Sequence, residues 1–365
     1  MRKKIAIITL HNVSNYGSVL QAYATQCFFE NMGLAPIIID YRRPWETTFG
    51  YWLYLNDRSL VGIFRNVMYF PSKIVQFFKF NKFRKQYLNL TNRKYKSCKE
   101  LQTYPVDSNI FCTGSDQVWN SGWNQGVIKE YFLDFVDENV KKIAFAASFG
   151  SSNISEKDKE IMKPLLEKYD VITVREEPTV NMLKNEFGIE CFEILDPTLQ
   201  MERNFWEQIC ENDRYIDEKY VLLIQLNRNH EFDNLSVQFA SEKKMKLVRL
   251  CLRVDQVLLP GESVVIPEVK DYIRLIRDAE YVLTDSFHAV SFCLNLEKQF
   301  FVYYPEKYSE RLKSILKITR LMNREIKENV NCGCVTSTIE YTFIRKILEE
   351  ERKKCKTIFK KYIGN

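Results

Sequence analysis

No segment of the sequence holds the ~20 consecutive apolar residues that a membrane-spanning helix needs. The apolar run Ile5–Leu10 near the start ends at polar residues and is too short for a signal peptide. These two absences predict a cytoplasmic protein. Histidine is also scarce, with three in 365 residues, which directs attention to the surroundings of each one.

Motifs that would indicate a metal or a dinucleotide are missing. The 10 cysteines are scattered, as reduced structural thiols are, and the close pair Cys332 and Cys334 has no second pair to complete a zinc site. The polar loop His11–Ser18, which follows the first apolar run, lacks the GxGxxG pattern of dinucleotide-binding loops. We therefore expect no metal and no bound cofactor.

The composition is that of an ordinary globular protein, with 45% hydrophobic and 27% charged residues. A chain of 365 residues is longer than one hydrophobic core usually serves, which predicts two domains. The net charge of +6 is too small to indicate nucleic acid by itself. It fits an anionic substrate or an anionic membrane surface equally well.

Short apolar runs alternate with polar turns and helical patterns, which is typical of α/β folds with parallel sheets. The strands of a first domain are expected at 5–10, 37–40, the start of 109–120, 142–147, 171–174 and 191–195. Those of a second domain are expected at 220–225, 245–250, 263–266, 281–284 and 300–303. The predicted domains are therefore 1–200 and 201–335, with a linker around 196–203 and a C-terminal helix over 336–365.

A segment rich in aromatic and basic residues interrupts the first domain at about 45–100, and acidic residues are almost absent from it after Asp57. We expect it to be mostly helical, with an interruption near Pro71. Its composition resembles an amphipathic segment at a membrane surface. A helix packed on the domain, with its basic face in water, is the alternative and is slightly favoured.

Polar residues follow the predicted strands, where a parallel sheet places its ligands. Asn15, Tyr16 and Gly17 follow the first strand, and a second group, Ser115, Asp116 and Gln117, follows the strand near 110. Arg175 follows the strand at 171–174, and a guanidinium there can bind a carboxylate or a phosphate through two hydrogen bonds. The alternative for Arg175 is an ion pair with a neighbouring acid.

The segment 284–303 is predicted to form a polar turn, a helix and a strand. His288 lies where the turn meets the helix. A histidine there can transfer a proton near neutral pH, and a helix N-terminus attracts anions. In the alternative interpretation, Asp285 and Ser286 only cap the helix and His288 packs beside it. The residues of this segment do not decide between the two.

Seven segments of the chain, in order, resemble those of the polysaccharide pyruvyl transferase family. They are HNVSNYGSVLQAYA, TGSDQVWN, AFAASFG, VREEPTV, LDPTL, TDSFHAVSF followed by EKQFFVY, and YSERLKSIL. Together they extend from about Ile5 to Arg324. A single one of these segments is only weakly specific for the family. All seven in the family's order indicate that the chain is a member of it.

The resemblance implies two Rossmann-like domains that face a cleft, as in glycosyltransferase-B enzymes. It implies a transferase that uses phosphoenolpyruvate as donor and leaves a pyruvate ketal on a sugar. The acceptor would belong to a surface polysaccharide, such as a capsular one, or to its lipid-linked oligosaccharide precursor. Peripheral contact with the inner face of the cell membrane is compatible with such an acceptor. A nucleic acid partner is not expected, and the oligomeric state is left open.

The family's functional residues carry over by position. His288 matches the catalytic histidine and Arg175 a strand-end arginine. Lys298 matches a lysine that is usually followed by proline, where this chain has Gln299; one branch has arginine at the position of Ser286. We therefore predict a catalytic role for one residue and donor binding for four others: His288, and Arg175, Lys298, Arg311 and Ser286. The acceptor or cleft residues would be the two groups near 15–17 and 115–117.

Two other functions stay open. A nucleotide-sugar glycosyltransferase could use the same fold, because one fold supports several chemistries. A non-catalytic relative acting as a binding protein is the second alternative, and the departures at Ser286 and Gln299 motivate it.

Overall fold

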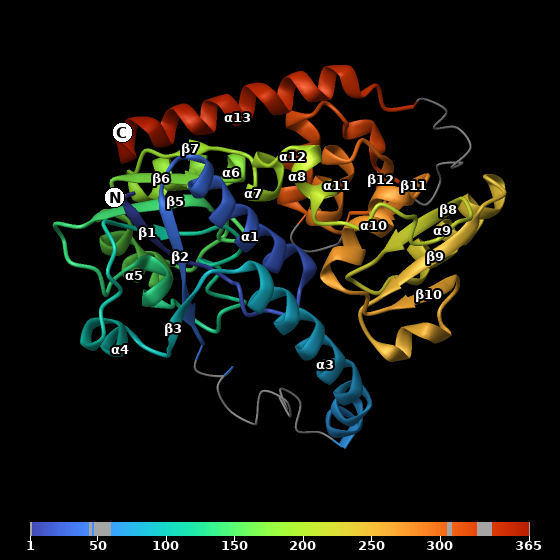
Figure 1. Cartoon of the computed structure of the whole chain (residues 1–365), viewed down its shortest axis with the longest axis horizontal. Helices are drawn as coiled ribbons and strands as arrows, with labels where there is room; N and C mark the ends of the chain where they lie inside the picture. Colours follow the sequence, from blue (N-terminus) through green and yellow to red (C-terminus); the bar gives the residue numbers. More distant parts are fainter. Residues whose placement is uncertain (1, 44–45, 47–59, 305–308, 327–337, 365) are drawn as a thin grey trace. The chain divides into compact units, whose positions relative to one another are not determined.

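The computed structural model divides into two compact units, each with its own sheet (Figure 1). It describes residues 2–43, 46, 60–304, 309–326 and 338–364, with the backbone alone described for 60–67. The first unit comprises 1–46, 84–201 and 347–365, and the second comprises 47–83 and 202–346. Among the described residues no sheet runs through both units, and every strand pair is parallel. The predicted fold class, two Rossmann-like α/β domains, is confirmed.

The sheet of the first unit has seven strands in the order β3-β2-β1-β4-β5-β6-β7. Its strands are β1 (Lys4–Ile8), β2 (Ala35–Tyr41), β3 (Leu90–Tyr95), β4 (Ile110–Thr113), β5 (Lys141–Ala147), β6 (Val171–Val174) and β7 (Phe192–Glu193). The central strands are buried along nearly their whole length, because helices cover both faces of the sheet. This burial explains why they are continuous apolar runs in the sequence.

Successive residues of β5 show how the two faces are covered, since neighbouring side chains in a strand point to opposite sides. The ring of Phe145 stacks on Phe28 at a centroid distance of 4.6 Å and meets Phe359 at 5.2 Å. Ala144 belongs to the apolar cluster on the other side, where Trp119 stacks on Phe132 at 5.4 Å. Both faces of this sheet therefore carry a hydrophobic core.

The helical segments of the first unit connect these strands. They are α1 (Tyr16–Asn31), α4 (Cys98–Thr103), η2 (Lys129–Phe132), α5 (Glu156–Leu166), α6 (Glu177–Met182), η3 (Leu183–Phe187) and α7 (Pro197–Gln200). The units divide between Met201 and Glu202, inside the predicted linker around 196–203, but Pro197–Gln200 form a buried helical turn that belongs to the first unit. A linker would be exposed, whereas all four residues of this turn are buried.

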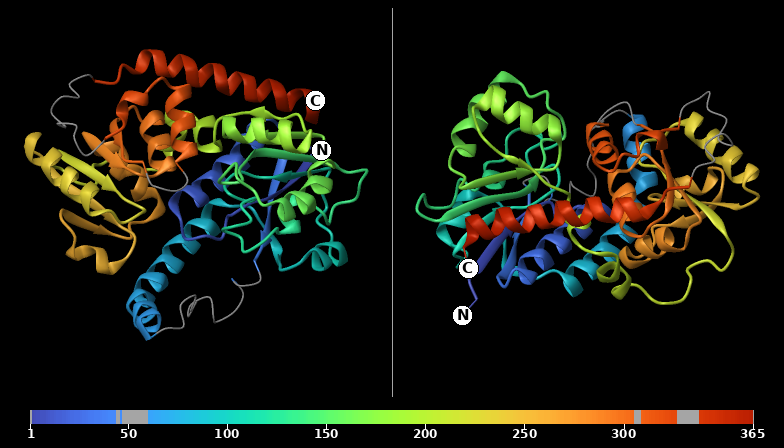
Figure 2. Two further views of the ribbon diagram at one scale, coloured as in Figure 1. Left: turned by 180° about the vertical axis from the view of Figure 1, so that it is seen from behind. Right: turned by 90° about the horizontal axis from the view of Figure 1, so that it is seen from above.

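The sheet of the second unit has five strands in the order β10-β9-β8-β11-β12. Figure 2 shows its yellow and orange strands from two further directions. Its strands are β8 (Tyr220–Ile224), β9 (Lys246–Cys251), β10 (Glu262–Val265), β11 (Tyr281–Thr284) and β12 (Gln299–Val302). The connecting helices are α8 (Arg203–Gln208), α9 (His230–Glu242), η4 (Val254–Leu258), α10 (Val269–Asp278), α11 (Phe287–Asn295), α12 (Glu310–Ile318) and η5 (Met322–Arg324). No described helix is both long enough and apolar enough to span a bilayer.

The segment predicted as an insert of the first domain is divided between the units. Its helix α3 (Leu60–Tyr87) runs through Pro71 without the expected interruption, and residues up to Phe83 cluster with the second unit. Side chains that follow the proline join this part of the helix to the second unit. The Ser72 hydroxyl accepts a bond of 2.9 Å from the Val254 amide, and Gln76 donates to the Leu252 carbonyl over 2.6 Å. The part of the insert at 47–59 lies outside the described residues.

The C-terminal helix α13 (Tyr341–Ile363) begins in the second unit, and its residues from Ile347 onward belong to the first. Phe359 is fully buried there, with its ring 6.0 Å from that of Phe28 and 5.8 Å from that of Phe29. A helix at the end of the chain thus completes a core that begins with α1.

Replacing Phe359 with alanine should leave a cavity against Phe28 and Phe145. We expect the free energy of unfolding to fall by about 3–5 kcal/mol, as it does when a buried aromatic is truncated. Urea denaturation followed by circular dichroism measures the change. Phe343→Ala is the control, because Phe343 lies on the same helix and is 45% exposed. Equal losses in both variants would contradict the packing described here.

Candidate functional site

Each sheet has one place where the strand order reverses, and open α/β sheets bind ligands at the carboxyl ends of the strands there. In the first unit this place lies between β1 and β4, and in the second between β8 and β11. The predicted residues near 15–17 and 115–117 follow β1 and β4, and His288 follows β11. These seven predicted residues therefore lie beside the two places where the strand order reverses.

After β1, the three predicted residues begin helix α1. The side chain of Asn15 accepts a hydrogen bond from the Ser18 amide over 3.2 Å, so Asn15 is the N-cap of the helix. Tyr16 and Gly17 are the first two helical residues, and both are buried. The structure thus gives Asn15 a capping role within the protein.

After β4, the chain passes close to β1 and then turns. A side chain at Gly114 would place its Cβ 2.8 Å from that of Thr9, so only glycine fits there. Asp116 follows with a φ of 74°, in the left-handed region that non-glycine residues seldom adopt. Its carboxylate accepts hydrogen bonds from the Ser18 hydroxyl and, over 2.9 Å, from the Gln117 amide. These bonds hold the turn against the start of α1.

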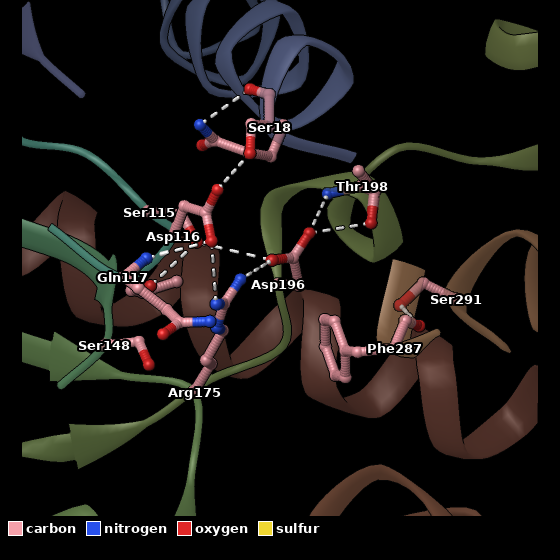
Figure 3. A network of polar contacts seen from close by, with 12 residues as sticks. Ser18, Ser115, Asp116, Gln117, Ser148, Arg175, Asp196, Thr198, Phe287 and Ser291 are labelled. Carbon is pink, nitrogen blue, oxygen red and sulfur yellow. Dashed lines mark hydrogen bonds and ion pairs between the residues drawn. The ribbon is translucent and has the colours of Figure 1, made fainter. Parts of the chain in front are cut away.

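Arg175 lies at the centre of the polar network in this unit (Figure 3). Its guanidinium donates to Asp196 over 2.7 Å, to Glu176 over 3.1 Å and to Asp116 over 3.2 Å. The arginine side chain is 0% exposed, and those of the three acids are at most 7% exposed. One buried cation therefore joins the ends of β4, β6 and β7.

The second carboxylate oxygen of Asp196 is also occupied. It accepts 2.9 Å and 2.7 Å hydrogen bonds from the Thr198 amide and hydroxyl, which start helix α7. Ser115, also fully buried, donates to the first oxygen over 3.3 Å and to the Ala146 carbonyl over 2.8 Å. Ser115 and Asp116, predicted to contact the acceptor, are therefore partners in this internal network.

These contacts argue against donor binding by Arg175, which stays a prediction. Burial alone would lower the pKa of the guanidinium, but the carboxylates of Asp196, Glu176 and Asp116 outweigh that effect and raise it. An incoming anion would meet a fully buried cation that three acids already neutralise. The structure agrees with the alternative stated for Arg175, an ion pair with neighbouring acids.

At the reversal point of the second sheet, Asp285 joins the loops after β8 and β11. Its carboxylate accepts from the Leu226 amide over 2.7 Å, and from the amide and side chain of Asn227 over 2.8 and 3.0 Å. Burial raises the pKa of the Asp285 carboxyl, although these hydrogen bonds act in the opposite direction. Asp285 thus clamps a loop, whereas the sequence had suggested a helix cap.

Ser286 is the residue that caps helix α11, since its side chain accepts from the Ala289 amide over 3.4 Å. His288 lies in the first turn of that helix, 8% exposed, with its ring edge-on to Phe287 at 5.2 Å. The guanidinium of Arg311 lies 5.8 Å from the centre of the same Phe287 ring. Ser286 and His288 thus flank Phe287 in the chain, and Arg311 lies beside the Phe287 ring.

The same edge of the sheet carries polar residues that the sequence analysis did not select. The hydroxyl of Tyr303, after β12, donates to Glu231 over 2.9 Å and accepts from Asn229 over 3.2 Å. These residues follow β12 and β8, which are not adjacent in the sequence but both flank β11. Their proximity could have been predicted from the strand order, because β8 and β12 lie on either side of β11.

Lys298 is placed elsewhere. It precedes β12, whose first residue pairs with Tyr281 at the start of β11, whereas His288 follows the end of β11. Strands rise about 3.3 Å per residue, so these two edges are on the order of 10 Å apart. Burial lowers the pKa of the Lys298 ammonium, although the carboxylate of Glu280 acts in the opposite direction. The structure therefore separates Lys298 from Ser286 and His288.

The described residues contain no group of three or more His, Cys, Asp or Glu side chains that could hold a metal ion. Cys332 and Cys334 lie outside the described residues.

Two solved structures have folds similar to that of this chain. One is described as a UDP-N-acetylglucosamine 2-epimerase of Listeria monocytogenes, with a TM-score of 0.51 and 10% identity over 98% of this chain and 91% of that chain. The other is the spinosyn rhamnosyltransferase SpnG, with a TM-score of 0.50 and 9% identity over 100% of both chains. At such identities the likeness shows the fold alone, which is that of glycosyltransferase-B enzymes.

The sequence identifies the family within this fold. The family model for polysaccharide pyruvyl transferase matches residues 15–307, most of the chain. The chain belongs to the polysaccharide pyruvyl transferase family, as the seven segments predicted, and it is a transferase of polysaccharide biosynthesis. No curated protein matches it.

Arg175→Ala should destabilise the first unit, because it leaves three buried carboxylates without their cation. Removing one partner of a buried ion pair costs about 3–5 kcal/mol, and we expect a loss of that size in urea denaturation. Arg203→Ala is the control, since its pair with Glu207 is exposed and should contribute less than about 1 kcal/mol.

The double variant Arg175→Met, Asp196→Asn should recover part of this loss, because it removes a charge together with its counter-charge. A stable Arg175→Ala protein that has lost only its affinity for an anionic substrate would contradict the structural role and restore the predicted donor contact.

Proposed function

We propose that the protein transfers the enolpyruvyl unit of phosphoenolpyruvate to two hydroxyls of a sugar, which becomes a pyruvate ketal. Family membership supports pyruvyl transfer in general. The observation that carries the proposal is the position of His288, in the first turn of α11, at the reversal point of the second sheet. That is where an open α/β sheet places a residue that acts on a bound ligand.

The residues around His288 suit the charges of the donor. Phosphoenolpyruvate carries a phosphate and a carboxylate, and the amides at the start of α11 attract anions. Arg311 brings a guanidinium to the same place, and Ser286 a hydroxyl. In this proposal Ser286, Arg311 and the first amides of α11 hold the donor, a task for which Arg175 is too enclosed.

The reaction requires two proton movements. A proton is added to the methylene carbon of the donor, which becomes the methyl group of the ketal. The adjacent carbon then accepts one sugar hydroxyl, loses phosphate and accepts the second hydroxyl. The proton of one hydroxyl returns to the group that protonated the methylene carbon. The proton of the other hydroxyl leaves with phosphate. We assign the proton transfer to His288, because imidazole gains and loses a proton near neutral pH.

His288→Gln should lower turnover by ~10²-fold or more, the usual contribution of a general acid or base. Mass spectrometry of sugar acceptors incubated with phosphoenolpyruvate measures the ketal formed. His230→Gln is the matched control, because His230 is an exposed residue at the start of α9 and should retain full activity. Nearly full activity in His288→Gln would show that another group moves the proton.

Thermal unfolding with added ligands separates this proposal from a nucleotide-sugar glycosyltransferase of the same fold. Stabilisation by phosphoenolpyruvate supports pyruvyl transfer, whereas stabilisation by a nucleoside diphosphate alone contradicts it. Stabilisation by neither ligand would favour the non-catalytic binding protein.

A further inference from the structure

Helix α3 presents an apolar stripe to solvent. Met68, Pro71, Val75 and Phe78 are spaced by three or four residues, so they lie on one face of the helix. Met68 is 50% exposed, Val75 is 38% exposed and Phe78 is 66% exposed. Large apolar side chains gathered on an exposed surface mark an interaction site more often than isolated ones do.

The stripe is distinct from the face by which α3 packs on its own unit. That face is formed by Ser72, Gln76 and Lys79, whose side chains bond to the backbone of Val254, Leu252 and Ile266. The same face includes the buried ring of Phe80. Contacts within the unit therefore explain the residues on one face of the helix. They do not explain why the residues of the stripe are apolar.

A second exposed apolar group lies on η4, which is attached to the same helix. Val254, Val257 and Leu258 are 42%, 43% and 88% exposed. The bond from the Val254 amide to Ser72 ties η4 to α3, and the guanidinium of Arg253 lies 4.5 Å from the centre of the Tyr69 ring. Two neighbouring elements of the second unit thus each expose apolar side chains.

The charge along α3 has one sign. Between Asp57 and Glu100 the sequence has no Asp or Glu, whereas Lys and Arg recur throughout. Exposed Lys82 and Lys85 continue the stripe beyond Phe78, again at spacings of four and three residues. Lys82 Nζ lies 3.7 Å from Glu268, but both side chains are partly in water, so this pair holds the lysine weakly.

We propose that the stripe of α3, together with η4, binds the surface of an anionic phospholipid membrane. Apolar side chains such as Phe78 and Leu258 would enter the boundary between headgroups and acyl chains, while the lysines meet the phosphates. A nucleic acid would satisfy the lysines but leave the aliphatic and aromatic side chains in water. The inference goes beyond the proposed reaction and does not depend on the identity of the donor.

Flotation of the full chain with vesicles tests this proposal. We expect binding to vesicles of phosphatidylcholine and phosphatidylglycerol at low salt, weaker binding at high salt, and little binding to phosphatidylcholine alone. Phe78→Glu should weaken binding by about 10-fold or more, because the phenyl ring no longer enters the apolar part of the bilayer. Lys82→Gln and Lys85→Gln should each weaken it about 5-fold, which corresponds to about 1 kcal/mol per cation.

Matched controls lie on other helices. Val237→Glu removes an apolar residue on α9 that is 42% exposed, and Lys353→Gln removes an exposed cation on α13. Both should bind vesicles like the unchanged protein, and thermal unfolding checks that every variant is folded. Absence of binding at low salt, or equal losses in Phe78→Glu and Val237→Glu, would overturn the proposal. Binding that depends on the lysines but not on Phe78 would indicate a general polyanion surface and would also overturn it.

Discussion

The first unit depends on one buried cation. Arg175 gathers carboxylates that follow β4, β6 and β7, three strands whose carboxyl ends would otherwise bring like charges into a water-excluded space. Without the guanidinium, each acid would need to take up a proton or reach water. The same network holds Asp116 in a left-handed conformation and fixes the start of α1 through Ser18. Loop positions in this unit are thus set by charge pairing as well as by apolar packing.

In the second unit an anion, and not a cation, holds the loops in place. There a buried carboxylate, Asp285, collects amide donors from the loop after β8, and the next residues start α11. The consequence is that the ends of two adjacent strands position His288, and sites supported by strands and helices hold their geometry more precisely than sites on loops. In both units the reversal of strand order brings together loops that are far apart in the sequence.

The sequence predicted the buried strands well, because a strand covered on both faces is apolar along its whole length, as β5 and β8 are. It missed β3, an edge strand of mostly polar residues with an exposed centre. It also misjudged Arg175, because partners such as Asp196, 21 residues away, meet it only once β6 and β7 are paired. Lys298 was assigned to the donor by its match to a family lysine, although the length of a strand separates it from His288 in the fold.

The path of the chain between the units bears on how the protein is made. The first unit begins at residue 1, yet its last segment is 347–365, where Phe359 fills the core beside Phe28 and Phe145. A ribosome releases the N-terminal part of a protein first, and independent domains usually fold as they emerge. Here one face of the first sheet cannot be completed until Phe359 and its neighbours have been synthesised. The second unit, whose last residue is Lys346, is therefore synthesised in full before the first unit receives the helix that completes its core.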